Sequence, residues 1–120
     1  MESRDYYEIR IYIGSENSKT GYPIYEFSLE KIIGEAQEEH EKVIPVRITK
    51  TTYVSGVSYK ERGWEIAAIN YPKISATTSE IKEFMMKLGR TFLEKCGQKR
   101  VCVVNSVDNK IIMLEGDKDG

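Results

Sequence analysis

The sequence predicts an α+β protein in which two helices cover one face of an antiparallel sheet. Two observations indicate this fold class. In several short segments apolar residues alternate with polar ones, which is the pattern of half-buried strands. In residues 24–40 and 77–96 apolar residues instead recur every three or four positions, as they do in amphipathic helices. Neither helix can bury its apolar stripe alone, so we expect both to pack on one face of the sheet.

The chain starts with a strand, a loop and the first helix. Residues 6–13 read YYEIRIYI and place three isoleucines on one side of a strand. The next segment, GSENSKTGYP, has the Gly, Ser and Asn content of a loop. From Ile24 to His40 the period becomes helical. One helical face gathers the apolar residues Tyr25, Leu29, Ile32, Ile33 and Ala36.

A pair of strands follows the first helix. Residues 43–60 are dominated by Thr, Val, Ile and Tyr, and their length indicates a strand that bends near Gly56. Residues 60–63, KERG, have the composition of a chain reversal in which glycine supplies a positive φ. Residues 64–71 are then expected to complete a hairpin.

The second helix has the clearest boundaries in the sequence. Thr77 and, three residues later, Glu80 match a capping box, and Gly97 can end the helix. Residues 100–105 and 110–114 read as two strands joined by a turn around Asp108-Asn109. The predicted fold is thus a ferredoxin-like β-α-β-β-α-β sandwich with an extra C-terminal strand. We expect a single domain over residues 1–115 and a flexible tail over residues 116–120.

Composition narrows the classes of function. The net charge of -1 argues against a protein held on nucleic acid by bulk charge. Cys96 and Cys102 flank a helix-to-strand junction and are expected to be free thiols. A single histidine, His40, and two separated cysteines do not supply the four ligands of a structural zinc site, so we expect no metal and no other cofactor. Without a signal peptide or an apolar run of about 18 residues, the protein is expected to be cytoplasmic.

Helices on one face leave the other face of the sheet open to a ligand, a partner or a second copy. Tyr offers a large apolar body with a hydroxyl, and Arg adds planar hydrogen bonding, so together they suit recognition. The predicted ligand-binding residues are Tyr12, Trp64, Arg10, Arg62 and Tyr59. Alternatively, the tyrosines only reflect a preference for sheets. Because an exposed aromatic face is costly on a monomer, we expect a homodimer or a higher homo-oligomer.

Two segments resemble the motifs of RNA-recognition domains. Residues 11–14, IYIG, are similar to the first-strand motif, and residues 62–64, RGW, are similar to the opening of the third-strand motif. The resemblance implies that Tyr12 and Trp64 stack on bases. However, the second aromatic position of the third-strand motif holds Ile66, and Glu65 before it would repel a phosphate backbone. RNA binding through the open face is therefore an alternative function, and nucleic acid is not the expected partner.

A second resemblance covers more of the chain. YEIRIYIG, a helix, a strand pair that ends in a Trp-Glu strand, and FLEKCGQKRVCVV are together similar to a small uncharacterised bacterial family of α+β proteins. In that family the last helix runs into a Phe-Gly-Gln-x-x-Val pattern, which residues 96–101, CGQKRV, match except for Cys96. This resemblance implies the fold and transfers no catalytic residue.

These observations lead to a non-enzymatic binding module as the main functional prediction. The module would hold a small planar or phosphorylated ligand, or a protein partner, and we predict no catalytic residues. One specific version is the sequestration of a nucleotide signal, as some phage counter-defence proteins do. The alternative from another class is a small ferredoxin-like oxygenase or isomerase, in which His40 or a buried tyrosine would be the acid–base group.

Overall fold

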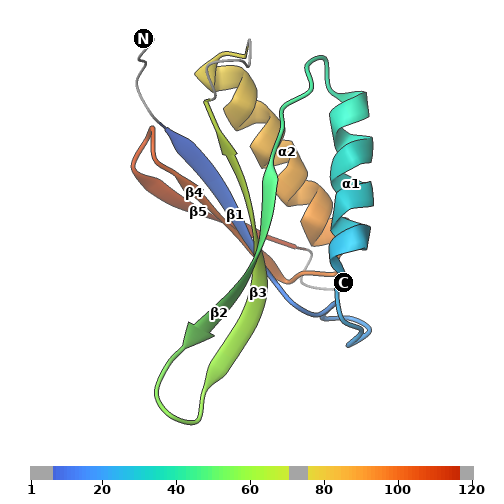
Figure 1. Ribbon diagram of the computed structural model, residues 1–120, viewed down its shortest axis with the longest axis vertical. Coiled ribbons are helices and arrows are strands. Elements are labelled where there is room, and N and C mark those ends of the chain that lie inside the picture. Colours follow the sequence, from blue (N-terminus) through green and yellow to red (C-terminus); the bar gives the residue numbers. More distant parts are fainter. Residues whose placement is uncertain (1–6, 71–75, 117–120) are drawn as a thin grey trace.

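The computed structural model describes residues 7–70 and 76–116 (Figure 1). Its elements are β1 (Glu8–Gly14), α1 (Glu26–Glu39), β2 (Arg47–Val54), β3 (Lys60–Ile69), α2 (Thr78–Lys95), β4 (Arg100–Asn105) and β5 (Lys110–Glu115). The predicted α+β class and the sequence of strands and helices are confirmed. The strand predictions for Tyr6 and Tyr71, and the tail prediction for residues 117–120, lie outside the described residues.

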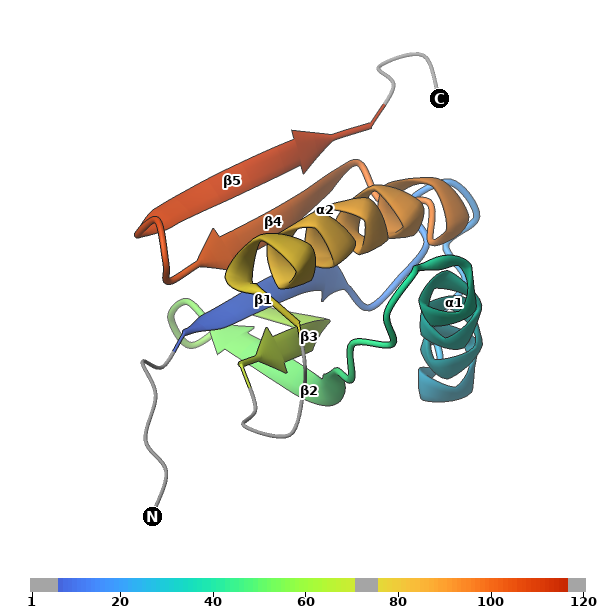
Figure 2. The ribbon, with the colours of Figure 1, turned by 90° about the horizontal axis from the view of Figure 1, so that it is seen from above.

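The strands form one five-stranded sheet in the order β2-β3-β1-β4-β5, and each neighbouring pair is antiparallel. β1 lies at the centre, between β3 and β4, and Figure 2 shows β2 and β5 at the two edges. The register between β1 and β3 places Tyr12 opposite Glu65 and Gly14 opposite Gly63. Because side chains alternate along a strand, this register decides which residues share a face.

Both helices lie on the same side of the sheet (Figure 1). α2 begins with the predicted capping box: the backbone N–H of Glu80 donates to the Thr77 hydroxyl at 3.2 Å, and the Thr77 N–H donates to the Glu80 carboxylate at 3.0 Å. The predicted apolar stripe of α2 is buried, and its members are Ile81, Phe84, Met85, Leu88 and Phe92. Gly97, with φ +57°, follows the C-terminus of this helix in the left-handed conformation that glycine adopts without strain.

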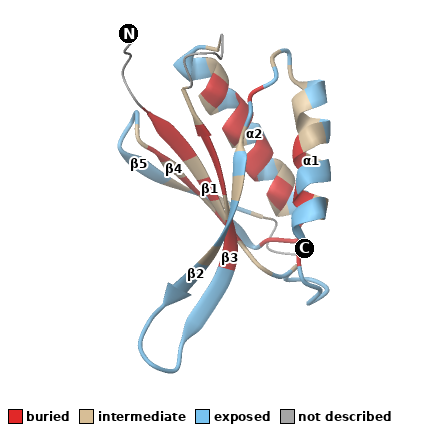
Figure 3. Cartoon of the chain, in the orientation of Figure 1, coloured by how far each residue is buried: buried red, intermediate tan, exposed pale blue. Residues whose placement is uncertain are grey.

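The hydrophobic core lies between the helices and one face of the sheet, which Figure 3 shows as buried segments of β1, β3, β4 and α2. β1 contributes Ile9, Ile11 and Ile13, as its alternation predicts. α1 contributes Leu29 and Ile33. Tyr25, which we assigned to the same buried stripe, is 54% exposed, because the helix begins only at Glu26 and Tyr25 is its N-cap residue.

The reversal between β2 and β3 lies at residues 55–59, and the prediction of a reversal at residues 60–63 is wrong. Gly56 has φ +87°, and the N–H of Ser55 donates to the carbonyl of Tyr59 at 3.0 Å. The positive φ therefore falls at Gly56, and residues 60–63 belong to β3. The outer half of this hairpin projects beyond the rest of the sheet as an exposed arm, which we define as residues 52–62 (Figure 3).

The β4–β5 hairpin turns as expected, with Asn109 at φ 53°. Gly116, just beyond β5, donates its N–H to the carbonyl of Lys99 at 3.0 Å. Within the described residues, neither helix has the length and apolarity that crossing a membrane requires.

Candidate functional site

The face of the sheet opposite the helices carries the polar and aromatic side chains of β1. Ile11 pairs with Val103 and Ile66 on the core side, so Arg10 and Tyr12 project from the other side. The predicted open face is therefore present, and these two residues lie on it. The hydroxyl of Tyr12 is 3.4 Å from Nη1 of Arg10, and its ring meets the ring of Tyr53 edge to face with centroids 6.3 Å apart.

Two facing glycines form the floor of a hollow at one end of the open face. Gly14 on β1 and Gly63 on β3 are register partners, so the layer beyond Tyr12 has no side chain on either strand. A Cβ at Gly63 would lie 2.4 Å from the carbonyl oxygen of Ile13, and a Cβ at Gly14 would lie 3.3 Å from Oε1 of Gln98. The close approach of the two strands thus requires glycine at Gly63, whereas a Cβ at Gly14 would require the Gln98 amide to shift by a few tenths of an ångström.

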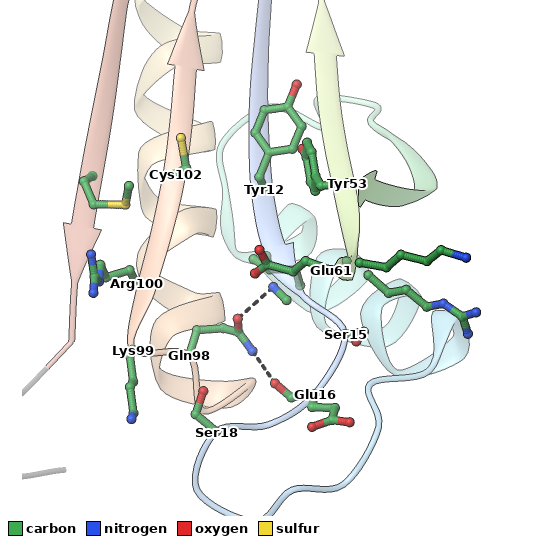
Figure 4. Close-up of a pocket in the computed structure, with 16 residues that line it drawn as sticks. Tyr12, Ser15, Glu16, Ser18, Tyr53, Glu61, Gln98, Lys99, Arg100 and Cys102 are labelled. Atoms are coloured by element: carbon green, nitrogen blue, oxygen red, sulfur yellow. Dashed lines mark hydrogen bonds between the residues drawn. The ribbon is translucent and has the colours of Figure 1, made fainter. Parts of the chain in front are cut away.

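Gln98 holds in place the loop after β1, which forms one wall of the hollow. Its side chain is buried, and its Oε1 accepts the N–H of Gly14 at 2.9 Å. Its Nε2 donates to the carbonyls of Glu16 at 2.9 Å and Cys96 at 3.1 Å, as Figure 4 shows for Gly14 and Glu16. The N–H of Ser18 also donates to the carbonyl of Gly97 at 2.9 Å. The loop after β1 is therefore tied to the turn after α2, although the two are 82 residues apart at Gln98 and Glu16.

The open-face hollow has a volume of about 560 Å³, within the usual range for small-molecule pockets. Figure 4 shows Tyr12 and Tyr53 side by side, with Glu61 near them and Gln98 below. Cys102 and Met113 line the side of β4 and β5. Other cations and carboxylates at its edge are Glu16, Lys60, Arg62, Lys99 and Arg100.

The two tyrosines of the hollow hold their protons more tightly than a free phenol does. Burial raises the pKa of Tyr12, and the negative charge of Glu65 raises that pKa further. Burial and the neighbouring Tyr12 also raise the pKa of Tyr53. Both phenols are therefore neutral near pH 7 and can donate a hydrogen bond to a ligand, while neither is suited to act as a base.

A set of ion pairs stands beside Tyr12 on the same face. Arg47 on β2 contacts Glu8 at 2.5 Å and Glu65 at 3.7 Å, and Arg10 contacts Glu8 at 3.5 Å. Glu8 is almost fully buried, with 8% of its side chain exposed, so its charge requires these guanidinium partners. The arrangement holds Arg10 next to the Tyr12 hydroxyl.

The structure brings together only part of the predicted ligand-binding set. Tyr12 lines the hollow, Arg10 contacts Tyr12, and Arg62 lies at the rim. Trp64 is placed elsewhere, because its register partner Ile13 faces the core. The residue is 5% exposed and lies on the helix side, where its indole N–H donates to the carbonyl of Ile24 at 3.1 Å. Tyr59 lies in the turn of the arm and is 57% exposed. The stacking role that the RNA-recognition motif implied for Trp64 on the open face is therefore wrong.

The residues considered for other chemistry lie outside the open-face hollow. His40 caps the C-terminus of α1, with its ring centroid 5.2 Å from that of Phe84. Cys96 is buried in the core, and burial raises its pKa to about 11, so its thiol is not activated. Among residues 7–70 and 76–116, no group of three or more His, Cys, Asp or Glu side chains is placed to hold a metal ion.

The predicted ligand-binding set leaves out several residues that line the hollow, among them Gly14, Tyr53, Glu61 and Gln98. The sequence feature that could have indicated this hollow is a pair of glycines, Gly14 at the end of the first predicted strand and Gly63 just before the Trp-Glu strand. When two strands pair, such glycines can leave a gap in one layer of side chains.

Solved structures provide the comparison with known proteins. No protein-family model matches the sequence, and no curated protein sequence matches it. The fold is similar to that of a phage SAM lyase in complex with S-methyl-5'-thioadenosine, with a TM-score of 0.67, 14% identity, and coverage of 98% of this chain and 97% of that chain. It is also similar to a phage SAM lyase in the apo state, with a TM-score of 0.66, 13% identity, and coverage of 92% and 90%.

This finding corrects the main functional prediction. We expected a non-enzymatic binding module and leaned away from an enzyme, whereas both structural neighbours are enzymes that share nearly the whole fold with this chain. At 14% identity the likeness concerns the fold and transfers no catalytic residue to this chain.

Proposed function

We propose that this chain is an enzyme that binds S-adenosylmethionine in the open-face hollow and cleaves it to S-methyl-5'-thioadenosine. The observation that carries the proposal is the likeness, over 98% of the chain, to a phage SAM lyase in complex with that thioadenosine. We also propose that the fold is the predicted ferredoxin-like sandwich. The order β2-β3-β1-β4-β5 is then a ferredoxin-like sheet with β5 added beside β4.

The side chains of the hollow suit a nucleoside that carries a sulfonium. The rings of Tyr12 and Tyr53 offer aromatic surface to a base and an electron-rich face to a cation. Glu61 is the register partner of Tyr53 and lines the same hollow (Figure 4). Its carboxylate takes part in no ion pair among the described residues, so it is available to a positive ligand group. The paired glycines let the ligand approach the backbone of β1 and β3.

The products define which bond breaks and which groups the protein has to supply. S-methyl-5'-thioadenosine keeps the methyl group and the adenosyl group on sulfur, so the bond that breaks joins sulfur to the amino-acid chain. The electron pair of this bond passes to sulfur, which becomes a neutral thioether and leaves without needing a proton. The carbon side is completed either by loss of a proton from the adjacent carbon or by attack of the ligand's own carboxylate. We assign Glu61 as the group that accepts the proton or orients the amino-acid chain, and Tyr12 as a hydrogen-bond donor held by Arg10.

The test is product formation by the purified chain. We expect S-methyl-5'-thioadenosine to form from S-adenosylmethionine faster than in a protein-free blank, as measured by liquid chromatography with mass spectrometry. Glu61→Gln keeps the size of the side chain and is expected to lower the rate by about 100-fold. Lys87→Gln on the outer surface of α2 is the matched control and should leave the rate unchanged. Absence of product together with absence of thioadenosine binding would refute the proposed function.

We propose that the chain forms a homodimer or a higher homo-oligomer, since β2 and β5 are unpaired edges of the described sheet. A monomeric mass by light scattering at high protein concentration would contradict this. A counter-defence role also remains a proposal, in which the protein would act by destroying an adenosyl compound.

A further inference from the structure

A second hollow, of about 850 Å³, lies on the helix side of β2 and β3. It is bounded by the residues that enter α1 and by the outer side of Trp64. It meets the open-face hollow only at the shared residues Ser15, Glu16, Arg62 and Gly63. Nothing in the proposed cleavage reaction uses this second hollow, which we call the α1-side hollow.

Aromatic rings line the α1-side hollow. Tyr25 and Phe27 stack on each other with centroids 5.5 Å apart and planes inclined by 8°, yet they are 54% and 68% exposed. Trp64 forms the inner wall, and its hydrogen bond to the carbonyl of Ile24 fixes the indole in place. Two large exposed rings next to a buried one make an apolar surface of the kind that binding sites present.

The chain already places a cation on this aromatic surface. Nζ of Lys50 lies 5.5 Å from the centroid of the Trp64 ring, within the range of a cation–π contact. Lys50 is an exposed residue on an edge strand, so its ammonium can return to water at little cost. The contact indicates that this ring face favours a positive charge.

The charges around the rings have the matching sign. The hollow is lined by three carboxylates, those of Glu16, Glu26 and Glu30, and no ion pair engages them among the described residues. Aromatic faces with carboxylates favour weakly hydrated, methylated cations over a hard metal ion, which requires a close shell of oxygen ligands.

We infer that the α1-side hollow binds a small methylated cation, a sulfonium or a quaternary ammonium, which replaces Lys50 on the face of Trp64. The site is distinct from the proposed reaction site and does not depend on the proposed function. Its aromatic residues hold the methyl groups, and its carboxylates balance the charge.

The experiment uses Trp64 as the reporter, since it is the only tryptophan of the chain. The full-length protein is titrated with trimethylsulfonium and with tetramethylammonium while tryptophan fluorescence is followed, and 3,3-dimethyl-1-butanol serves as a neutral probe of similar bulk. We expect a saturable change with both cations and none with the alcohol. Lys50→Ala removes the competing ammonium and should tighten binding by about two- to fivefold. Lys31→Ala removes the same charge from a position outside the hollow and should leave affinity unchanged.

A second variant protects the test against a folding artefact. Phe27→Ala removes an exposed ring, so it should leave the urea midpoint unchanged and weaken the binding of both cations. The inference is overturned if neither cation changes the fluorescence of the wild type or of Lys50→Ala. It is equally overturned if the neutral alcohol binds as well as the cations, or if Lys31→Ala and Lys50→Ala respond alike. Product formation plays no part in the readout, so failure of the proposed cleavage would leave the result interpretable.

Discussion

Replacing Gly63 by alanine tests whether the floor of the open-face hollow depends on close strand contact. The added Cβ would lie 2.4 Å from the carbonyl oxygen of Ile13, whereas carbon and oxygen normally approach to about 3.3 Å. The two strands would therefore have to separate by about 1 Å at the point where β1 and β3 pair. Since backbone atoms cannot move aside as a flexible side chain can, we expect a loss of about 2 to 3 kcal/mol in the free energy of unfolding.

The assay is urea unfolding followed by circular dichroism, with a thermal scan in parallel. For a chain of this size the loss corresponds to a fall in Tm of about 8 to 12 °C. Gly34→Ala is the matched control, because a Cβ there meets nothing within 4 Å and the residue lies inside α1. That substitution should stabilise the protein by about 0.5 to 1 kcal/mol. A Gly63→Ala variant as stable as the wild type would show that close contact between β1 and β3 does not require glycine at this position.

Three further predictions concern other parts of the fold. Gln98→Met removes the hydrogen bonds to Gly14 and Glu16 and should lower the free energy of unfolding by about 2 kcal/mol. An unchanged urea midpoint would contradict the role of Gln98 in tying the loop after β1 to the turn after α2. The Thr77 backbone N–H and, to a lesser extent, Lys42 lower the pKa of Glu80. This carboxylate therefore stabilises the fold above its unfolded pKa, and the contribution is lost as pH falls through the folded pKa. Glu80→Gln should weaken the acid dependence of the unfolding free energy, and a pH profile of stability identical to that of the wild type would count against this. Burial raises the pKa of Cys96 to about 11, so alkylation of the folded protein should modify the half-buried Cys102 first. Mass spectrometry that shows Cys96 modified first would contradict its placement in the core.

Local patterns predicted most of the elements. The alternation in β1 identified both its buried isoleucines and its open-face residues Arg10 and Tyr12, because a single residue of register decides both. The capping box located the start of α2, since Thr77 and Glu80 satisfy each other's backbone within four residues. Such features depend on neighbours in sequence, so they are accessible without a structure.

The errors arose where a position depends on distant residues. Gly56 suggested only a bend within a strand and Gly63 suggested the reversal, whereas the pairing of β2 with β3 shows that the chain reverses at Gly56. Trp64 was placed on the open face by analogy with a motif, yet its pairing with Ile13 turns it toward the helices. The contact between Gln98 and Gly14 joins residues 84 positions apart, and no local pattern predicts it. The relation to a small bacterial family stays a prediction.

The arm of β2 and β3 has a consequence for how the open-face hollow moves. Residues 52–62 are all exposed, and a two-stranded ribbon with so little packing is marginally stable by itself, so the arm should fluctuate more than the sheet it extends. Tyr53 and Glu61 lie within the arm, while Tyr12 and Gln98 belong to the rigid body of the protein. One wall of the open-face hollow therefore lies on the packed sheet and the other on the arm, so bending of the arm changes the width of the hollow. A ligand held by both sides would damp that bending, which would appear as slower amide hydrogen exchange in the ribbon, far along the chain from Tyr12.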